Sequence, residues 1–154
     1  MFLPSAVFGQ DAEIPFGSLG HDTSAQVEIS AERLSIDQES GSAIFEGNVV
    51  IGQGTMRLTA AKVEALYSAE SSGVTGQISR LVASGGVTIL GGEEAMEAQQ
   101  ADYSVAEGTI VLTGSVLMTQ GQNAISAERA VVDLNTGKAV LEGRVRTILQ
   151  TGGN

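Results

Sequence analysis

The chain has 154 residues, of which 42% are hydrophobic and only 4% aromatic, and it carries a net charge of -10 without any cysteine. This length fits one domain that buries a core without disulfides. The net negative charge argues against binding to the phosphate backbone of nucleic acid, which requires clustered lysine and arginine. No apolar stretch reaches the roughly 18 residues of a membrane-spanning helix, so no transmembrane helix is predicted.

Residues 1–24 are predicted to be a flexible lead-in. They begin with the apolar stretch MFLPSAVFG, which is followed by the polar QDAE. Two interpretations remain open: the end of a secretory signal peptide whose start is missing, or an ordinary frayed terminus. The only histidine, His21, lies between Ser18 and Asp22 in this lead-in. A catalytic triad within one flexible stretch is not expected, and one histidine without cysteine predicts no metal site.

Residues 25–150 are predicted to form the domain, followed by a flexible tail at 151–154. The domain repeats one skeleton: an alanine, a glycine ten residues on, a glycine sixteen residues on, and a valine two residues later. The copies begin at Ala31, Ala60, Ala98 and Ala127, which gives a unit of 29 residues with a nine-residue insertion in the second copy. The insertion lies around YSAESSGVTGQIS, a polar, glycine-rich sequence typical of a loop or an extended hairpin. The phrases that begin at Ile29 and Ile125 are identical at 11 of 21 positions.

Each unit has a hydrophobic period of two, which predicts half-buried strands rather than helices. AIFEGNVVI, GTIVLTGSVLM and KAVLEGRVRT all alternate in this way, and DQESGS, AEGT, GQG and DLNTGK between strands are turn signals. AAKVEALYSAE contains helix-forming residues, but it occupies a strand position of its repeat and is predicted to be a strand. A glycine recurs at one strand position, at residues 47, 85, 114 and 143. Glycine inside a strand marks a bend or a close approach, so every such strand is predicted to bend at one level. Stacked units then bury jointly what one unit cannot bury alone.

These phrases resemble the periplasmic lipopolysaccharide-transport family that is also called organic-solvent-tolerance or OstA-like. The resemblance is carried by AERLSID, FEGNV, ASGGV, YSV and LEGRV, and it covers about residues 20–148. It implies an all-β fold, an open twisted β-jellyroll of antiparallel strands with a slot between two sheets. It further implies a periplasmic bridge whose protomers stack head to tail and pass lipopolysaccharide between inner-membrane and outer-membrane components. The family implies no catalytic residues and no cofactor.

The apolar stripe of the strands is compatible with this function. Shielding ten lipid methylenes from water is worth about 8 kcal/mol, and a carrier for acyl chains needs an uncharged slot. The acidic balance also keeps the protein from gripping the lipid's phosphates. The predicted lipid-contacting residues are Ile36, Phe45, Val49, Leu58, Leu112, Val116 and Leu134.

An open stack leaves strand edges at both ends, and we expect Val27, Ile29, Val145 and Thr147 to lie on these edges. Neither AQVEIS nor VRTILQ contains proline, so strand pairing between chains is feasible. The shared phrase at both ends has two open interpretations. Either one end imitates the next unit of another protomer, or the similarity is plain descent by duplication.

Two other functions compete with the lipid carrier: a polymerising β-solenoid scaffold with a dry core, and a carbohydrate-active β-helix enzyme. Paired carboxylates can hydrolyse glycosides, and Asp37 with Asp133, and Glu46 with Glu142, occupy equal repeat positions. Turn capping and outward-facing strand positions explain these acids better. Arg33 and Arg129, and likewise Glu32 and Glu128, are interpreted as surface ion pairs or as contacts to a neighbouring protomer. The glycine pairs 85–86 and 91–92 lack the strand-to-helix context of a phosphate loop.

Overall fold

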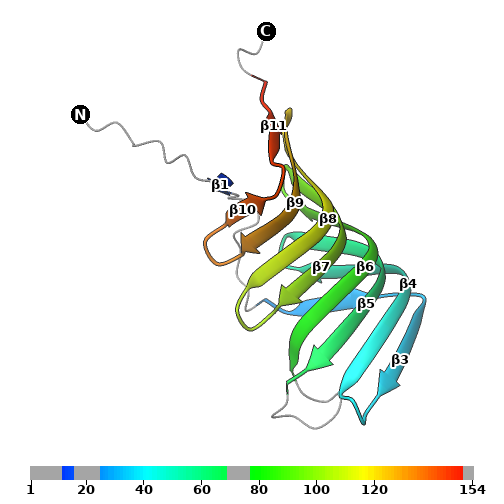
Figure 1. The fold of residues 1–154 in the computed structure, drawn as a ribbon. Coiled ribbons are helices and arrows are strands. Elements are labelled where there is room, and N and C mark those ends of the chain that lie inside the picture. The colour runs from blue at the N-terminus through cyan, green and yellow to red at the C-terminus, as the bar shows by residue number, and fades with distance from the viewer. Residues whose placement is uncertain (1–11, 16–24, 69–76, 151–154) are drawn as a thin grey trace.

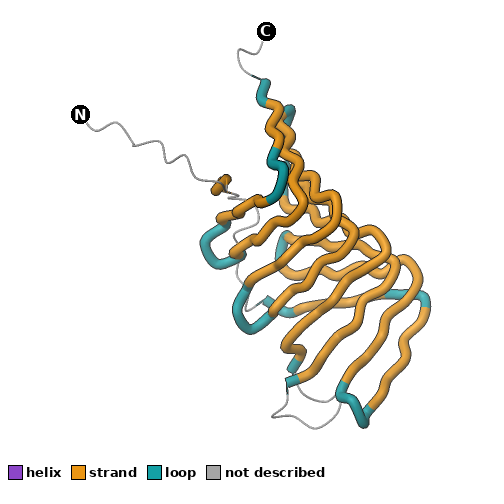
Figure 2. Tube along the Cα trace, viewed as in Figure 1, coloured by secondary structure: helices purple, strands orange, loops and turns teal. Residues whose placement is uncertain are grey.

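The computed structural model describes residues 12–15, 25–68 and 77–150 (Figure 1). Within these ranges every regular element is a β-strand, as Figure 2 shows, which confirms the all-β prediction. The strands are β1 (Ala12–Pro15), β2 (Val27–Ser30), β3 (Arg33–Asp37), β4 (Ser42–Gln53), β5 (Met56–Tyr67), β6 (Ile78–Gly91), β7 (Glu94–Ser104), β8 (Thr109–Gln120), β9 (Asn123–Asp133), β10 (Lys138–Glu142) and β11 (Arg146–Ile148). The described residues contain no helix long and apolar enough to cross a membrane.

The strands form one continuous antiparallel sheet in which each long strand pairs with its neighbours in sequence. The order runs β1-β10-β9-β8-β7-β6-β5-β4-β2, with β3 paired to β4 and β11 paired to β9. The first unit supplies two short strands, β2 and β3, and the last supplies β10 and β11, so both ends of the sheet consist of interrupted strands. The antiparallel prediction is confirmed, and β5, whose sequence favours a helix by composition, is a strand of 12 residues.

Every second strand bends at the glycine that the repeat predicts. Gly114 has a φ of 85°, the next residue Ser115 has a φ of 50°, and the pairing of β8 with β9 shifts register between Thr113 and Val116. A Cβ at Gly114 would lie 2.5 Å from Oε1 of Gln99 on the neighbouring strand, so only glycine allows this close approach. The same two-residue corner occurs at Gly47-Asn48, Gly85-Gly86, Gly114-Ser115 and Gly143-Arg144. The predicted common bend is therefore confirmed.

The line of corners divides the sheet into two arms. The first arm contains β3, β10 and the long-strand segments on their side of the corners, and the second arm contains β2, β11 and the remaining segments. Alternate side chains of both arms point to the same inner face, where they form one apolar core cluster. The core thus lies between the two arms of a folded sheet, which is the predicted open, twisted β-jellyroll.

The turns follow the predicted signals. Asp37 accepts a hydrogen bond from the backbone N–H of Glu39 (2.9 Å), and Asp133 accepts one from the backbone N–H of Asn135 (2.9 Å). These aspartates therefore cap equivalent turns, as expected. The β5–β6 hairpin extends to the described flanks of the insertion, since the backbone N–H of Ser68 donates to the carbonyl of Gln77 (2.8 Å). Residues 69–76, and His21 with its neighbours, lie outside the described residues.

Candidate functional site

The predicted lipid-contacting residues come together on the inner face, mostly deep inside it. Five of them are at most 1% exposed and belong to the single core cluster: Val49, Leu58, Leu112, Val116 and Leu134. The other two lie toward the open end of the first arm. Phe45 on β4 is half-buried against the core, and Ile36 on the edge strand β3 is 51% exposed. The sequence thus placed the residues on one face but did not distinguish the buried positions from the accessible ones.

A buried hydrogen bond joins the two arms far from the corners. The Tyr103 hydroxyl, near the first-arm end of β7, donates to Oε1 of Gln53, the last residue of β4 on the second arm. Burial raises the pKa of Tyr103 to about 12, partly offset by the bond to Gln53. Gln53 also donates to the carbonyl oxygen of Ala25 at 2.9 Å. A polar contact therefore joins the ends of the two arms beside the apolar core cluster.

Buried polar side chains gather at the ends of the strands rather than along the inner face. Glu94, the first residue of β7, is buried and accepts a hydrogen bond from Gln120 at 3.0 Å. Among the described residues the buried polar or charged side chains are Ser42, Gln53 and Glu94, and of these three only Glu94 is a carboxylic acid. Because Ser42, Gln53 and Glu94 all stand at the first or last position of their strands, the inner face between the ends is uncharged.

The charged pairs lie on the opposite, outer surface of the sheet. Arg80 makes a two-pronged contact to Asp102, which raises the pKa of this half-exposed arginine through hydrogen bonding and charge attraction. Arg129 donates to Glu142 at 2.7 Å, which matches the expected surface ion pair. Such exposed pairs contribute little to stability.

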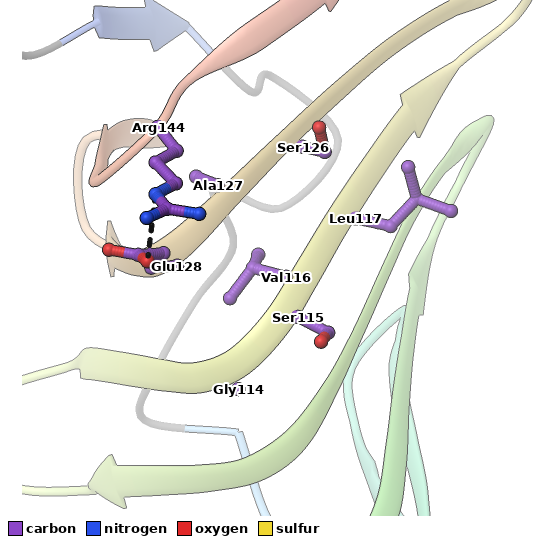
Figure 3. A pocket seen from close by; sticks show the side chains of 8 residues that line it. All are labelled: Gly114, Ser115, Val116, Leu117, Ser126, Ala127, Glu128 and Arg144. Carbon is purple, nitrogen blue, oxygen red and sulfur yellow. Dashed lines mark ion pairs between the residues drawn. The ribbon is translucent and has the colours of Figure 1, made fainter.

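The sheet carries shallow depressions at its corners that the sequence analysis did not identify. The larger, of about 550 Å³, lies where β8 bends at Gly114 and is closed on one side by Arg144, whose Nε lies 3.8 Å from Glu128 Oε2 (Figure 3). A second, of about 380 Å³, occupies the equivalent place of the first copy beside Gly47. The signal for both was present in the sequence, because each consists of a glycine corner and the alanine-bearing strand that follows it.

The ends of the sheet expose most of the large apolar side chains that the described chain leaves in solvent. Leu34 and Ile36 lie on β3 at one end, and Ile148 and Leu149 lie at or just after β11 at the other. The predicted edge residues Val27, Ile29 and Val145 are half-buried against the core, and Thr147 is exposed. At β3 the apolar inner face thus reaches the surface. On β11 it is Thr147 that pairs with the buried Ile125, whereas the exposed Ile148 pairs with Ala124 and points to the outer face.

A folded antiparallel sheet with an uncharged inner face defines this protein as an open β-jellyroll. The family model described as LptA/(LptD N-terminal domain) LPS transport protein matches residues 28–138, and the chain belongs to this family. The family expected from the sequence phrases is therefore confirmed.

A solved structure supports the same fold. The chain is similar to LptH, the LptA homologous periplasmic component of the conserved lipopolysaccharide transport device from Pseudomonas aeruginosa. The two share 19% identity at a TM-score of 0.71, and the match covers 84% of this chain and 98% of LptH. At this identity the likeness shows the fold. A search of curated protein sequences found no match.

Proposed function

We propose that this protein is a non-enzymatic carrier that holds the acyl chains of lipopolysaccharide between its two arms. It passes the lipid across the periplasm from the inner toward the outer membrane. Its partners are lipopolysaccharide, the inner-membrane and outer-membrane components of the transport bridge, and further copies of itself stacked head to tail. Membership of a lipopolysaccharide-transport family and the jellyroll fold support this proposal.

The observation that carries the proposal is the continuous uncharged inner face. From Val49 on β4 to Leu141 on β10, the long strands contribute apolar side chains to one cluster. Each lipid methylene that leaves water for such a surface gains about 0.8 kcal/mol. Since the same kind of side chain recurs along the whole sheet, an acyl chain can move along it without meeting a charged group. Such a surface favours transit over tight binding at one point.

Lipid reaches this face only when the arms separate, because most of the predicted contacts are buried between them. The Tyr103–Gln53 hydrogen bond is one contact that must then break. The open end near β3 offers the easiest entry, since Ile36 and Phe45 are already accessible there. We therefore propose that acyl chains enter beside these two residues and spread the arms progressively.

The close packing of the arms also favours the scaffold as a second candidate function. Leu112 and Leu134 are fully buried by the protein's own side chains, and a polymerising scaffold requires only such a filled core. The carrier and the scaffold share the same edges and the same stacking. They differ in whether the inner face ever contacts lipid.

A photocrosslinking comparison of two adjacent residues tests the carrier. A photoreactive amino acid replaces Phe45 in one variant and Ile44 in the other. Both residues are half-buried on β4, but successive side chains of a strand point to opposite faces. Phe45 is on the inner face against the core and Ile44 is on the outer face. Purified protein is mixed with lipopolysaccharide, irradiated and analysed for a lipid-shifted band.

The carrier predicts a strong crosslink from position 45 and at most a weak one from position 44. Equal crosslinking from both positions would indicate surface adsorption, and none from either would favour the scaffold. Unchanged circular dichroism of both variants controls for folding. Release of saccharide fragments from the lipopolysaccharide would instead support the enzyme.

A further inference from the structure

The last strand of the repeat, β10, has a partner on its outer side that does not belong to the repeat. Strand β1 pairs with it antiparallel, with Ala12 facing Leu141, Ile14 facing Ala139 and Pro15 facing Lys138. The opposite end of the sheet differs, since β3 pairs only with β4 among the described strands. One end of the sheet is therefore covered over its first arm, and the other is open.

The internal joints of the sheet predict how a second copy would continue it at β10. Inside the chain, the bent strand of one unit pairs with the first strand of the next unit three times, as β4 with β5, β6 with β7 and β8 with β9. The register is the same each time: Ser42 faces Leu66, Arg80 faces Ser104, and Thr109 faces Asp133. Lys138 occupies the position of Thr109 one unit later, and Asp37 occupies the position of Asp133 in the first unit. A fourth joint of the same kind would therefore place Lys138 opposite Asp37 of a second copy.

Strand β1 occupies this predicted register residue for residue. Pro15 faces Lys138 where Asp37 of a second copy would lie, and Ile14 faces Ala139 where Ile36 of a second copy would lie. We propose that β1 is an internal cap that holds the docking edge of β10, and that a second copy joins the stack by displacing β1 with its own β3. This inference rests on the proposed head-to-tail stacking and names the contact that regulates it.

The second copy offers more to the edge than β1 does. In the predicted register Lys138 faces Asp37 of the second copy, and Glu142 faces Arg33 of the second copy, so both pairs have opposite charge. Opposite charges that face each other across antiparallel strands are favourable. If β10 paired with β10 of another copy, or β3 with β3, these charge pairs would be lost. Beyond the corner, β2 of the second copy would also pair with β11 of the first copy. Strand β1 covers only the four residues Lys138–Leu141, so the exchange gains strand pairing.

The sequence of β1 is better suited to ending the sheet than to pairing with another copy. It is four residues long and ends in Pro15, which has no backbone N–H for a further strand. Short strands and proline are common devices for stopping edge-to-edge association. With β1 in place, the sheet therefore ends at this edge instead of recruiting another chain.

Association measurements on the full chain test the cap. In the variant Glu13→Pro/Ile14→Pro, one of the two substituted residues must have pointed its N–H at β10, because successive residues of an antiparallel strand alternate in direction. The variant Glu13→Ala/Ile14→Ala keeps both donors and serves as the matched control. Sedimentation velocity over a range of concentrations gives the apparent self-association constant of each.

The cap predicts that the proline variant associates about tenfold more tightly than the wild type, since the docking edge is no longer mostly occupied. The alanine control should stay close to the wild type. Equal association of all three proteins, at a measurable constant, would overturn the cap and leave the stacking intact. A strictly monomeric state of all three at every concentration would overturn the stacking as well.

Engineered cysteines test the register directly, since the chain has no native cysteine. Glu13→Cys with Val140→Cys in one chain should form an intramolecular disulfide under an added oxidant, because these residues face each other. This locked chain should remain monomeric until a reductant is added. A mixture of Ser35→Cys chains and Val140→Cys chains should form an intermolecular disulfide in the predicted joint. The control is a mixture of Ser40→Cys chains and Val140→Cys chains. The shared register would be overturned if the control mixture crosslinked as fast as the Ser35→Cys mixture, or if the intramolecular disulfide left self-association unchanged.

Discussion

The first copy of the repeat and the three later copies differ sharply in burial at a position where all four carry an apolar or aromatic residue. Ile36 of the first copy corresponds to Ala65, Tyr103 and Val132 of the later copies. All four belong to the first arm and point to the inner face. Yet Ile36 is 51% exposed, whereas the other three are at most 1% exposed.

This difference separates the direction in which a side chain points from its burial, two properties that a hydrophobic pattern usually predicts together. The repeat position determines which way a side chain points, because it fixes the strand, the register and the distance from the corner. Burial also requires a strand on each side, which β5, β7 and β9 have and β3 lacks. The first unit is thus a later unit without a neighbour on one side, which is why its apolar residues remain available for association.

The largest effect is expected when a core residue of an inner copy is truncated. Leu112→Ala should lower the free energy of unfolding by about 3 kcal/mol through lost burial and a cavity. Ile36→Ala at the first copy should lower it by less than about 1 kcal/mol, since half of that side chain is already exposed. Urea unfolding at low protein concentration measures both. A loss at Ile36 that grows with concentration would show that another copy covers this end.

A corner substitution should have the next largest effect. Gly114→Ala must hold an alanine at a φ of 85° and place its Cβ 2.5 Å from Gln99 Oε1, which we expect to destabilise the fold by about 2 kcal/mol or more. Gly121→Ala is the control, because its φ is 60° but a Cβ there meets nothing within 4 Å. It should lose only about 1 kcal/mol. Equal losses in thermal unfolding would mean that the corners do not depend on close approach.

The last prediction concerns pH and the contact between the arms, and its effect is confined to alkaline pH. The pKa of Tyr103 is raised from 10.0 in its ordinary state to about 12 in the folded chain. The neutral phenol is therefore favoured by folding, and this contribution is complete below pH 10 and is lost as the pH rises toward 12. Urea unfolding of the wild type should show this loss between these pH values. The Tyr103→Phe variant should lack that component, and identical pH profiles of both proteins would contradict the assignment.

The sequence predicted the strands, the turns and the corner glycines, because all of them recur with the 29-residue unit. It did not predict the Tyr103–Gln53 bond, since that contact joins the two arms and depends on how the whole sheet twists. The strand β1 was also missed. Its four residues contain no repeat phrase, and their partner lies at the far end of the chain. The division of the lipid-contacting candidates into buried and accessible residues required the neighbours of each strand.

The regular corner has a consequence for the reach of the molecule. Each 29-residue copy adds two strands, and neighbouring strands lie about 4.8 Å apart. The length of the trough therefore changes in steps of nearly 10 Å when a copy is gained or lost by duplication. Because every copy presents the same bend and register to the next, such a change alters the length of the folded sheet and leaves the contacts at its two ends unchanged.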